Sequence, residues 1–200
     1  SLKGEEGKMI SSTNIKAKTQ ELLRPLAQNL ESIGVTPNAI TFLGFILSLL
    51  SGILIGVGEV LSGALLFTLS GLCDTLDGIL ARVSGRKSSF GAFLDSFLDR
   101  YSDFFPLAGV CYFAHVNQDS LLLVLTLLTI AGSYATSYAR ARAESLGVDC
   151  KVGLVERPER FFILLFALFT GYLLPTLSVL AVLTNFTAFQ RLMCAMRELS

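Results

Sequence analysis

The chain has 200 residues, of which 52% are hydrophobic, and its mean hydropathy is +0.62. This apolar share exceeds the roughly 45–50% of ordinary soluble domains and predicts a polytopic, all-α membrane protein. Sixteen basic and sixteen acidic residues give a formal net charge of zero, so no basic excess favours a nucleic-acid partner.

Two regions precede the first long apolar stretch. Residues 1–15 are polar and lack the charged and apolar regions of a signal peptide, so we expect a tail, or a linker to an upstream domain. We expect residues 16–200 to form one membrane domain. Near its start, four apolar residues recur at helical spacing and predict an amphipathic helix in the membrane interface: Leu22, Leu26, Leu30 and Ile33.

Six apolar stretches approach the roughly 20 residues that a transmembrane helix needs. They are 36–57, 60–81, 90–114, 120–139, 161–174 and 176–194. Thr36 or Asn38 can cap the first stretch, with Pro37 in its first turn. The predicted fold is therefore six transmembrane helices preceded by the interfacial helix.

Lysine and arginine residues are concentrated at alternate ends of these stretches. Apart from Arg100 within the third stretch, they occur before the first stretch, in the 82–88 and 140–160 connections and at the C-terminus. The opposite connections GVGEV, HVNQD and YLLPT contain none. By the positive-inside rule, both termini and the two basic connections are predicted to lie in the cytoplasm of a cell-membrane protein.

Four aspartates lie near the predicted cytoplasmic ends of the second and third stretches. Asp74 and Asp77 are three residues apart, and Asp95 and Asp99 are four apart, so each pair lies on one helix face. If the faces meet, the carboxylates need bound cations to stay ionised side by side. Oxygen ligands select hard ions such as Mg²⁺ or Mn²⁺, which keep positions for phosphate oxygens. The pattern predicts a metal site for a phosphate-bearing substrate, and hydrogen bonding between helices is the structural alternative.

Small and basic residues accompany these acids. Gly78, Ala81 and Gly91 leave the helix surface open where a flat ligand or another backbone approaches closely. Arg82 adds a fixed cation that suits a diphosphate. Together they favour a ligand site over a purely structural role for the acids.

The combined pattern resembles the signature of the CDP-alcohol phosphotransferases. It runs Asp74-x-x-Asp77-Gly78-x-x-Ala81-Arg82 and, after eight residues, Gly91-x-x-x-Asp95-x-x-x-Asp99. The resemblance implies that Asp74, Asp77 and Asp95 hold two Mg²⁺ or Mn²⁺ ions, with Asp99 as a further ligand and as the general base. It also implies a site for the CDP group formed by Asp74, Gly78, Ala81, Arg82, Gly91 and Asp95.

Membership of that family would imply a metal-dependent transferase of phospholipid synthesis. Its donor would be a CDP-linked lipid, either CDP-diacylglycerol or an archaeal ether analogue, and CMP would be released. Two metals can neutralise the diphosphate while Asp99 takes the proton of an acceptor hydroxyl. Family members are commonly dimers, so we expect a homodimer surrounded by membrane lipids.

The acceptor is predicted from basic residues of the 140–160 connection and the last helix. Several arginines aimed into one pocket suit a dianionic phosphate, although cytoplasmic loops are also basic for topology alone. The strings RARAESLG and GLVERPER resemble the branch that uses inositol phosphate, the phosphatidylinositol phosphate and archaetidylinositol phosphate synthases. That resemblance implies an acceptor-phosphate site formed by Arg157 and Arg191 with Arg140, Lys151 and Arg160.

Three alternatives stay open from the sequence alone. Glycerol 3-phosphate is also a phosphate ester and would use the same arginines within the same family. A cation transporter would place its acids near the middle of the membrane on broken helices. An intramembrane prenyltransferase also uses paired acids but would usually need more spans.

The remaining polar residues are assigned no chemistry. Asp103 continues the face of the acids on the third stretch, and we expect it to pair with Arg100 or a neighbour. His115 lies on the side opposite the acids. The cysteines lack a C-x-x-C pair and are predicted to be core-filling thiols, neither disulfides nor metal ligands: Cys73, Cys111, Cys150 and Cys194.

Overall fold

The computed structural model describes residues 21–86 and 88–199, and all regular structure within these ranges is helical. The predicted tail, residues 1–15, lies outside them. Residues 21–32 are helical, and six helices follow: α2 (Pro37–Gly56), α3 (Val60–Val83), α4 (Ser89–Val116), α5 (Ser120–Ser145), α6 (Arg157–Thr170) and α7 (Leu173–Leu199). The all-α prediction is confirmed.

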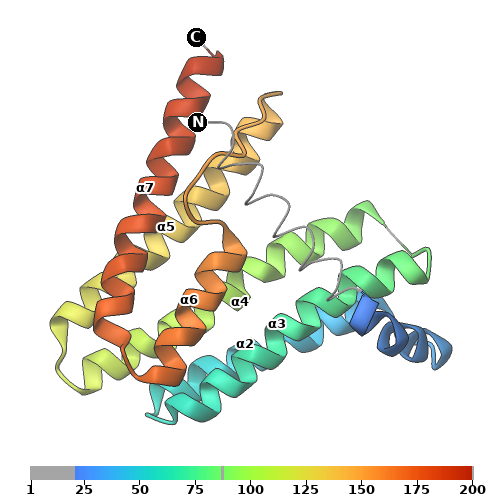
Figure 1. Cartoon of the computed structure of the whole chain (residues 1–200), viewed down its shortest axis with the longest axis horizontal. Coiled ribbons are helices and arrows are strands. Elements are labelled where there is room, and N and C mark those ends of the chain that lie inside the picture. Colours follow the sequence, from blue (N-terminus) through green and yellow to red (C-terminus); the bar gives the residue numbers. More distant parts are fainter. Residues whose placement is uncertain (1–20, 87, 200) are drawn as a thin grey trace.

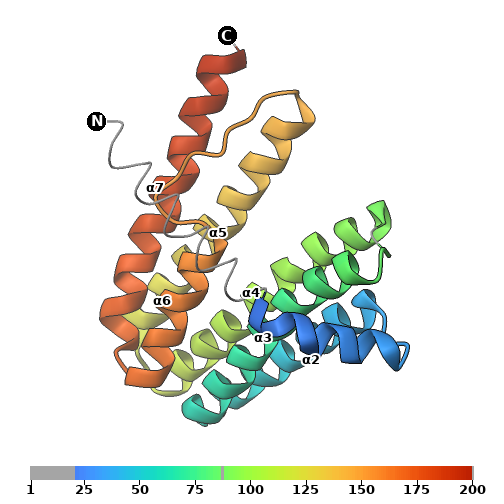
Figure 2. The same ribbon diagram turned by 45° about the vertical axis from the view of Figure 1, so that its right-hand side comes forward.

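The helices form two arms that share α4 and α6. Helix α2 packs against α3 and α4 in one arm, and α5 packs against α7 in the other. Helix α4 continues from the first arm to α5, while the short α6 contacts both α3 and α7. Figures 1 and 2 show that the C-terminal ends of α5 and α7 diverge from the loop that joins α3 to α4. The start of α6 therefore lies where the arms separate.

Four of the described helices, α2, α3, α5 and α7, are long and apolar enough to cross a membrane. This agrees with the predicted class of membrane protein. Thr36 caps α2 by accepting a hydrogen bond from the Ala39 backbone N–H, and Pro37 stands in the first turn, as predicted.

The boundary between α6 and α7 differs from the predicted stretches. Helix α6 ends at Thr170 rather than near residue 174, because Gly171 takes the left-handed conformation, with φ of 75°, that ends a helix. Helix α7 then begins at Leu173 and carries Pro175 in its first turn. A proline there loses no intrahelical hydrogen bond, so it marks a helix start and not a break between two stretches.

The helical stretch 21–32 packs on the protein through Leu23, Ala27 and Leu30. Leu23 and Leu30 pack, with the fully buried Ala27, against a core cluster of α2 and α3. Leu22 is 79% exposed, and Leu26 and Ile33 are also exposed. Only Leu30 of the four predicted residues contacts the protein core, so an interfacial position for the other three stays a prediction.

Helices α2 and α4 pack with their backbones in close contact. Ser48 donates a hydrogen bond of 2.6 Å from its hydroxyl to the Ser102 carbonyl oxygen. A Cβ atom on Gly52 would overlap the Phe105 carbonyl, and one on Gly109 would overlap the Gly52 carbonyl. Small residues permit this approach in membrane helices, where close packing and hydrogen bonds replace hydrophobic burial between helices.

The prediction of four free thiols is wrong for two of them. Cys150, in the connection before α6, forms a disulfide with Cys194 of α7, whereas Cys73 and Cys111 are free. The connection lies against α7 there, because the Val155 N–H donates to the Thr187 hydroxyl at 3.2 Å. The two cysteines are 44 residues apart, so their pairing depends on a path of the loop that no local spacing encodes.

We predict that Gly52→Ala lowers the unfolding temperature, because its methyl group must push α2 away from α4. Overpacking of this kind costs about 1–3 kcal/mol. Gly78→Ala is the matched control, since a Cβ there meets only the Arg82 guanidinium, at 3.9 Å. Alanine also favours the helix at that position. Circular dichroism in detergent suits a chain without tryptophan, and equal melting of both variants would contradict the close packing.

Candidate active site

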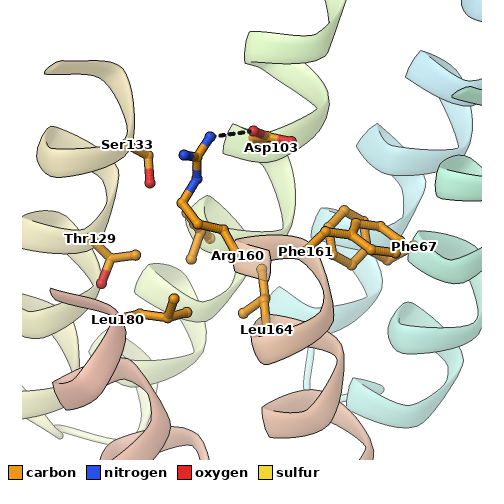
Figure 3. Close-up of a pocket in the computed structure, with 9 residues that line it drawn as sticks. Phe67, Asp103, Thr129, Ser133, Arg160, Phe161, Leu164 and Leu180 are labelled. Carbon is orange, nitrogen blue, oxygen red and sulfur yellow. Dashed lines mark hydrogen bonds and ion pairs between the residues drawn. The ribbon is translucent and has the colours of Figure 1, made fainter. Parts of the chain in front are cut away.

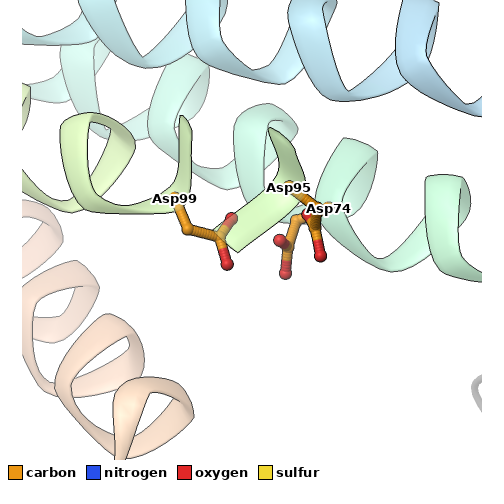
Figure 4. A group of neighbouring side chains, drawn as sticks. All are labelled: Asp74, Asp95 and Asp99. Carbon is orange, nitrogen blue, oxygen red and sulfur yellow. The ribbon is translucent and has the colours of Figure 1, made fainter. Parts of the chain in front are cut away.

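Three of the four predicted acids come together between α3 and α4. Asp74 of α3 and Asp95 and Asp99 of α4 each offer an oxygen atom, and these atoms lie within 4.8 Å of one another. Figure 4 shows the three carboxylates side by side. Ser88 caps α4 by accepting a hydrogen bond from the Gly91 N–H at 2.9 Å. Helix α4 therefore begins soon after the end of α3, and this short connection brings the acids of the two helices together.

Asp77, the fourth acid, does not share this cluster. It is only 5% exposed, and its Oδ2 atom accepts a hydrogen bond of 2.6 Å from the Thr41 hydroxyl of α2. Sequence reasoning did not identify Thr41. The one available signal was a hydroxyl one turn into an otherwise apolar stretch, which does not by itself reveal a partner 36 residues away.

The cluster has the donor set that a hard divalent cation requires. All three groups are carboxylates, which suit Mg²⁺ or Mn²⁺. The Oδ1 atom of Asp95 is buried and has no hydrogen-bond partner in the described part of the chain. A buried acceptor without a partner is costly, and a cation bound beside it would remove that cost. The acids therefore fit a divalent metal site.

Arg157, the first residue of α6, forms ion pairs with two of these acids. Its Nη1 atom lies 2.9 Å from Asp74 Oδ1 and 2.8 Å from Asp99 Oδ2. Its Nε atom donates to Asp103 Oδ1 at 3.1 Å. The sequence suggested Arg157 for an acceptor phosphate and did not predict that it bridges the acids. One guanidinium thus joins α6 to both α3 and α4.

Arg160 lies one turn further along α6 and is 8% exposed. Its Nη2 atom is 3.4 Å from Asp103 Oδ2, and it lines an internal pocket with Thr129 and Ser133 of α5 (Figure 3). Asp103 therefore pairs with Arg157 and Arg160 of α6. Of the expected partners, Arg100 or a neighbour, Arg100 forms no ion pair with it among the residues that the structure describes.

The other three predicted phosphate-binding residues are held elsewhere. Arg191 is 3% exposed and donates to the Val152 and Thr136 carbonyl oxygens, both at 2.9 Å. Arg140 pairs with Glu144, and Lys151 pairs with Asp149, in both cases on the protein surface. Of the five, the structure brings only Arg157 and Arg160 into contact with the α4 acids, while Arg191 fastens the 146–156 connection to α5.

The small residues of the pattern have different surroundings. The space beside Gly78 is open except for the Arg82 guanidinium, which suits the close approach of a ligand. Ala81, one turn before the end of α3, is half-buried. A Cβ atom on Gly91 would lie 3.0 Å from the Ser88 hydroxyl and 3.3 Å from Asn38 Oδ1. Packing of α4 against the start of α2 is therefore sufficient to explain Gly91.

Comparison with known proteins identifies the family. The model of the CDP-alcohol phosphatidyltransferase family matches residues 34–194, which include the acids, Arg157 and Arg191. The chain belongs to this family. It is therefore an integral membrane protein of an enzyme family, in agreement with the resemblance seen in the aspartate pattern.

Individual relatives cover most of the chain. The archaetidylinositol phosphate synthase of Pyrococcus horikoshii is 34% identical over 94% of this chain and 97% of its own length. The fold also matches a crystal structure of the phosphatidylinositol phosphate synthase of Mycobacterium tuberculosis with CDP-DAG bound. That match has a TM-score of 0.82 and 33% identity, and it covers 88% of this chain and 94% of the other. A second structure of the same enzyme, in complex with manganese and citrate, matches with a TM-score of 0.81, 33% identity and coverage of 86% and 88%.

We predict that Arg157→Gln tightens Mn²⁺ binding by about tenfold, because the guanidinium competes with the ion for Asp74 and Asp99. Isothermal titration of the purified protein with MnCl₂ measures this directly. Arg142→Gln is the control, since Arg142 is an exposed arginine bonded to Ser145. Unchanged or weaker binding in Arg157→Gln would show that the ion and Arg157 do not share these oxygens.

Proposed function

We propose that this protein transfers a phosphatidyl-type group from a CDP-linked lipid to a hydroxyl of inositol phosphate and releases CMP. The observation that carries the proposal is the contact between the acidic cluster and Arg157, with Arg160 one turn away. A site for metal and diphosphate thus adjoins cations suited to a second phosphate. The names of the two related synthases support inositol phosphate as the acceptor.

The donor side of the site is formed by α3 and α4. Asp74, Asp95 and Asp99 would hold a divalent ion, and Asp77 would serve a second ion if it exchanged its bond to Thr41. Bound Mg²⁺ or Mn²⁺ would supply charge neutralisation at the diphosphate and at the leaving CMP. The CDP group would lie along α3 against Gly78, Ala81 and Arg82, and would reach Gly91 on α4.

Asp99 is the proposed general base. Its carboxylate is 16% exposed and pairs with Arg157 at 2.8 Å, so a phosphate held by Arg157 brings the acceptor's hydroxyl groups close to it. The acceptor oxygen forms a bond to the lipid phosphorus, and the phosphorus–oxygen bond to CMP breaks. Asp99 takes the hydroxyl proton. Positioning contributes much of the rate, because a carboxylate paired with a cation is a weak base.

The membrane arrangement follows from the charge distribution. We propose that α4 and α6 lie in the membrane with the four more apolar helices, giving six membrane helices, and that the 21–32 helix lies in the interface. Helix α6, with 14 residues, would cross only part of the bilayer. Both termini and the site would face the cytoplasm. The lipid donor would then keep its tails in the bilayer while the acceptor enters from water, and the chain would act as a homodimer.

The acceptor is tested by CMP release from CDP-diacylglycerol in proteoliposomes containing Mg²⁺ or Mn²⁺. We expect turnover with inositol phosphate to exceed that with glycerol 3-phosphate, serine and unphosphorylated inositol. Glycerol 3-phosphate is the second candidate, because the same two arginines suit its phosphate. Turnover with glycerol 3-phosphate and none with inositol phosphate would replace the proposed acceptor, and no CMP release with any acceptor would remove the enzyme assignment.

We expect Asp99→Asn to lower turnover by roughly 10²–10⁴-fold, the usual contribution of a general base, while CDP-lipid binding is retained. Asp119→Asn is the matched control. Asp119 caps α5, at the end of α4 remote from the acids, and asparagine caps equally well. Binding can be measured with a fluorescent CDP-lipid. An equal loss of binding and turnover would make Asp99 chiefly a ligand.

A further inference from the structure

Asp103 is the one acid of the α4 face that contacts both arginines at the start of α6. Its two oxygen atoms are used separately: Oδ1 accepts from Arg157 Nε at 3.1 Å, and Oδ2 lies 3.4 Å from Arg160 Nη2. Figure 3 shows the Arg160 contact. Asp103 is not part of the cluster formed by Asp74, Asp95 and Asp99. Both of its oxygens already have cationic partners, which distinguishes it from the proposed metal ligands.

We infer that Asp103 positions Arg157 and Arg160 for the phosphate of the acceptor, and thereby sets the preference for a phosphorylated acceptor. This inference rests on the proposed function and deepens it. Asp103 is a positioning residue, because its oxygens contact the two arginines and it acts on the substrate through them.

The geometry of Arg157 explains why one carboxylate has this effect. A guanidinium is planar, so a bond at Nε fixes the plane in which the other four N–H groups lie. Asp103 provides that bond, while Asp74 and Asp99 share Nη1. When other ligands occupy Asp74 and Asp99, the bond from Nε to Asp103 would remain and keep Nη1 directed at the site. Without it, Nε has no partner that sets the plane of the guanidinium once Asp74 and Asp99 bind other ligands.

Arg160 adds a second reason. It is almost completely buried, and Asp103 is its one ion-pair partner among the described residues. A buried guanidinium without a counter-ion is strongly unfavourable, so Asp103 keeps a second charged donor in place behind Arg157. The ion pairs form a chain that runs from the proposed base into the protein interior: Asp99, Arg157, Asp103 and Arg160. Negative and positive groups alternate along it.

The test measures KM for inositol phosphate, KM for the CDP-lipid, and Mn²⁺ affinity in Asp103→Asn. We expect KM for inositol phosphate to rise roughly tenfold, as for loss of a charged hydrogen bond. We also expect the preference for inositol phosphate over unphosphorylated inositol to fall by a similar factor. The CDP-lipid KM should not change, and the Mn²⁺ affinity should not fall. Asp119→Asn should leave all four quantities unchanged.

A second pair of variants covers the case in which Asp103→Asn does not fold, because it leaves Arg160 without a counter-ion. The double variant Asp103→Asn/Arg160→Gln removes both members of that buried pair. It is compared with Arg160→Gln alone, in which Asp103 still holds Arg157. We expect a higher KM for inositol phosphate in the double variant than in Arg160→Gln.

Three results would overturn the inference. They are an unchanged acceptor preference in both Asp103 variants, a loss of Mn²⁺ affinity, which would make Asp103 a metal ligand, and an equal loss of all parameters. Failure of the proposed function is recognised separately in the wild-type protein. If that protein uses glycerol 3-phosphate in place of inositol phosphate, the proposed acceptor is wrong, and the Asp103 variants are judged by the KM for glycerol 3-phosphate.

Discussion

The ion pairs of Arg157 hold together three helices that would otherwise meet as a group of like charges. Carboxylates of Asp74, Asp99 and Asp103 surround its guanidinium, and they come from α3 and α4 while Arg157 begins α6. In low-dielectric surroundings an unpaired charge is far more costly than in water, so these groups stabilise one another. The position of α6 therefore depends on the acids as much as the acids depend on it.

Apolar packing supports the same position of α6. Phe161 lies against Gly71 of α3, where a Cβ atom would overlap its ring, and its ring centroid is 4.6 Å from that of Phe67. An aromatic side chain next to Arg160 thus presses the start of α6 onto α3. A short helix of 14 residues has little stability of its own, so tertiary contacts at its first turn determine where it lies.

The structural features that could be predicted from the sequence are those that depend on residues close together in the chain. The Thr36 cap and the one-turn spacing of Asp95 and Asp99 on α4 depend on residues a few positions apart. Two contacts depend on elements that are distant in the chain. One is the hydrogen bond between Thr41 and Asp77, and the other joins the buried Arg191 to carbonyl oxygens of the 146–156 connection and α5. The basic residues of the 140–160 connection predict a cytoplasmic loop. They do not show which arginines contact the site and which, like Arg191, bind the loop to the helices.

At the start of α6, side chains rather than backbone N–H groups are suited to bind an anion. A helix N-terminus favours anions through its free N–H groups, but Glu156 and Glu159 form a capping box that uses their own N–H groups, and Pro158 has none. A cation in the first turn is unfavourable beside the positive end of the helix dipole, and the carboxylates around Arg157 offset this. Few N–H groups are thus left at this N-terminus for a phosphate, and the guanidinium groups held by Asp103 are the charged donors beside it.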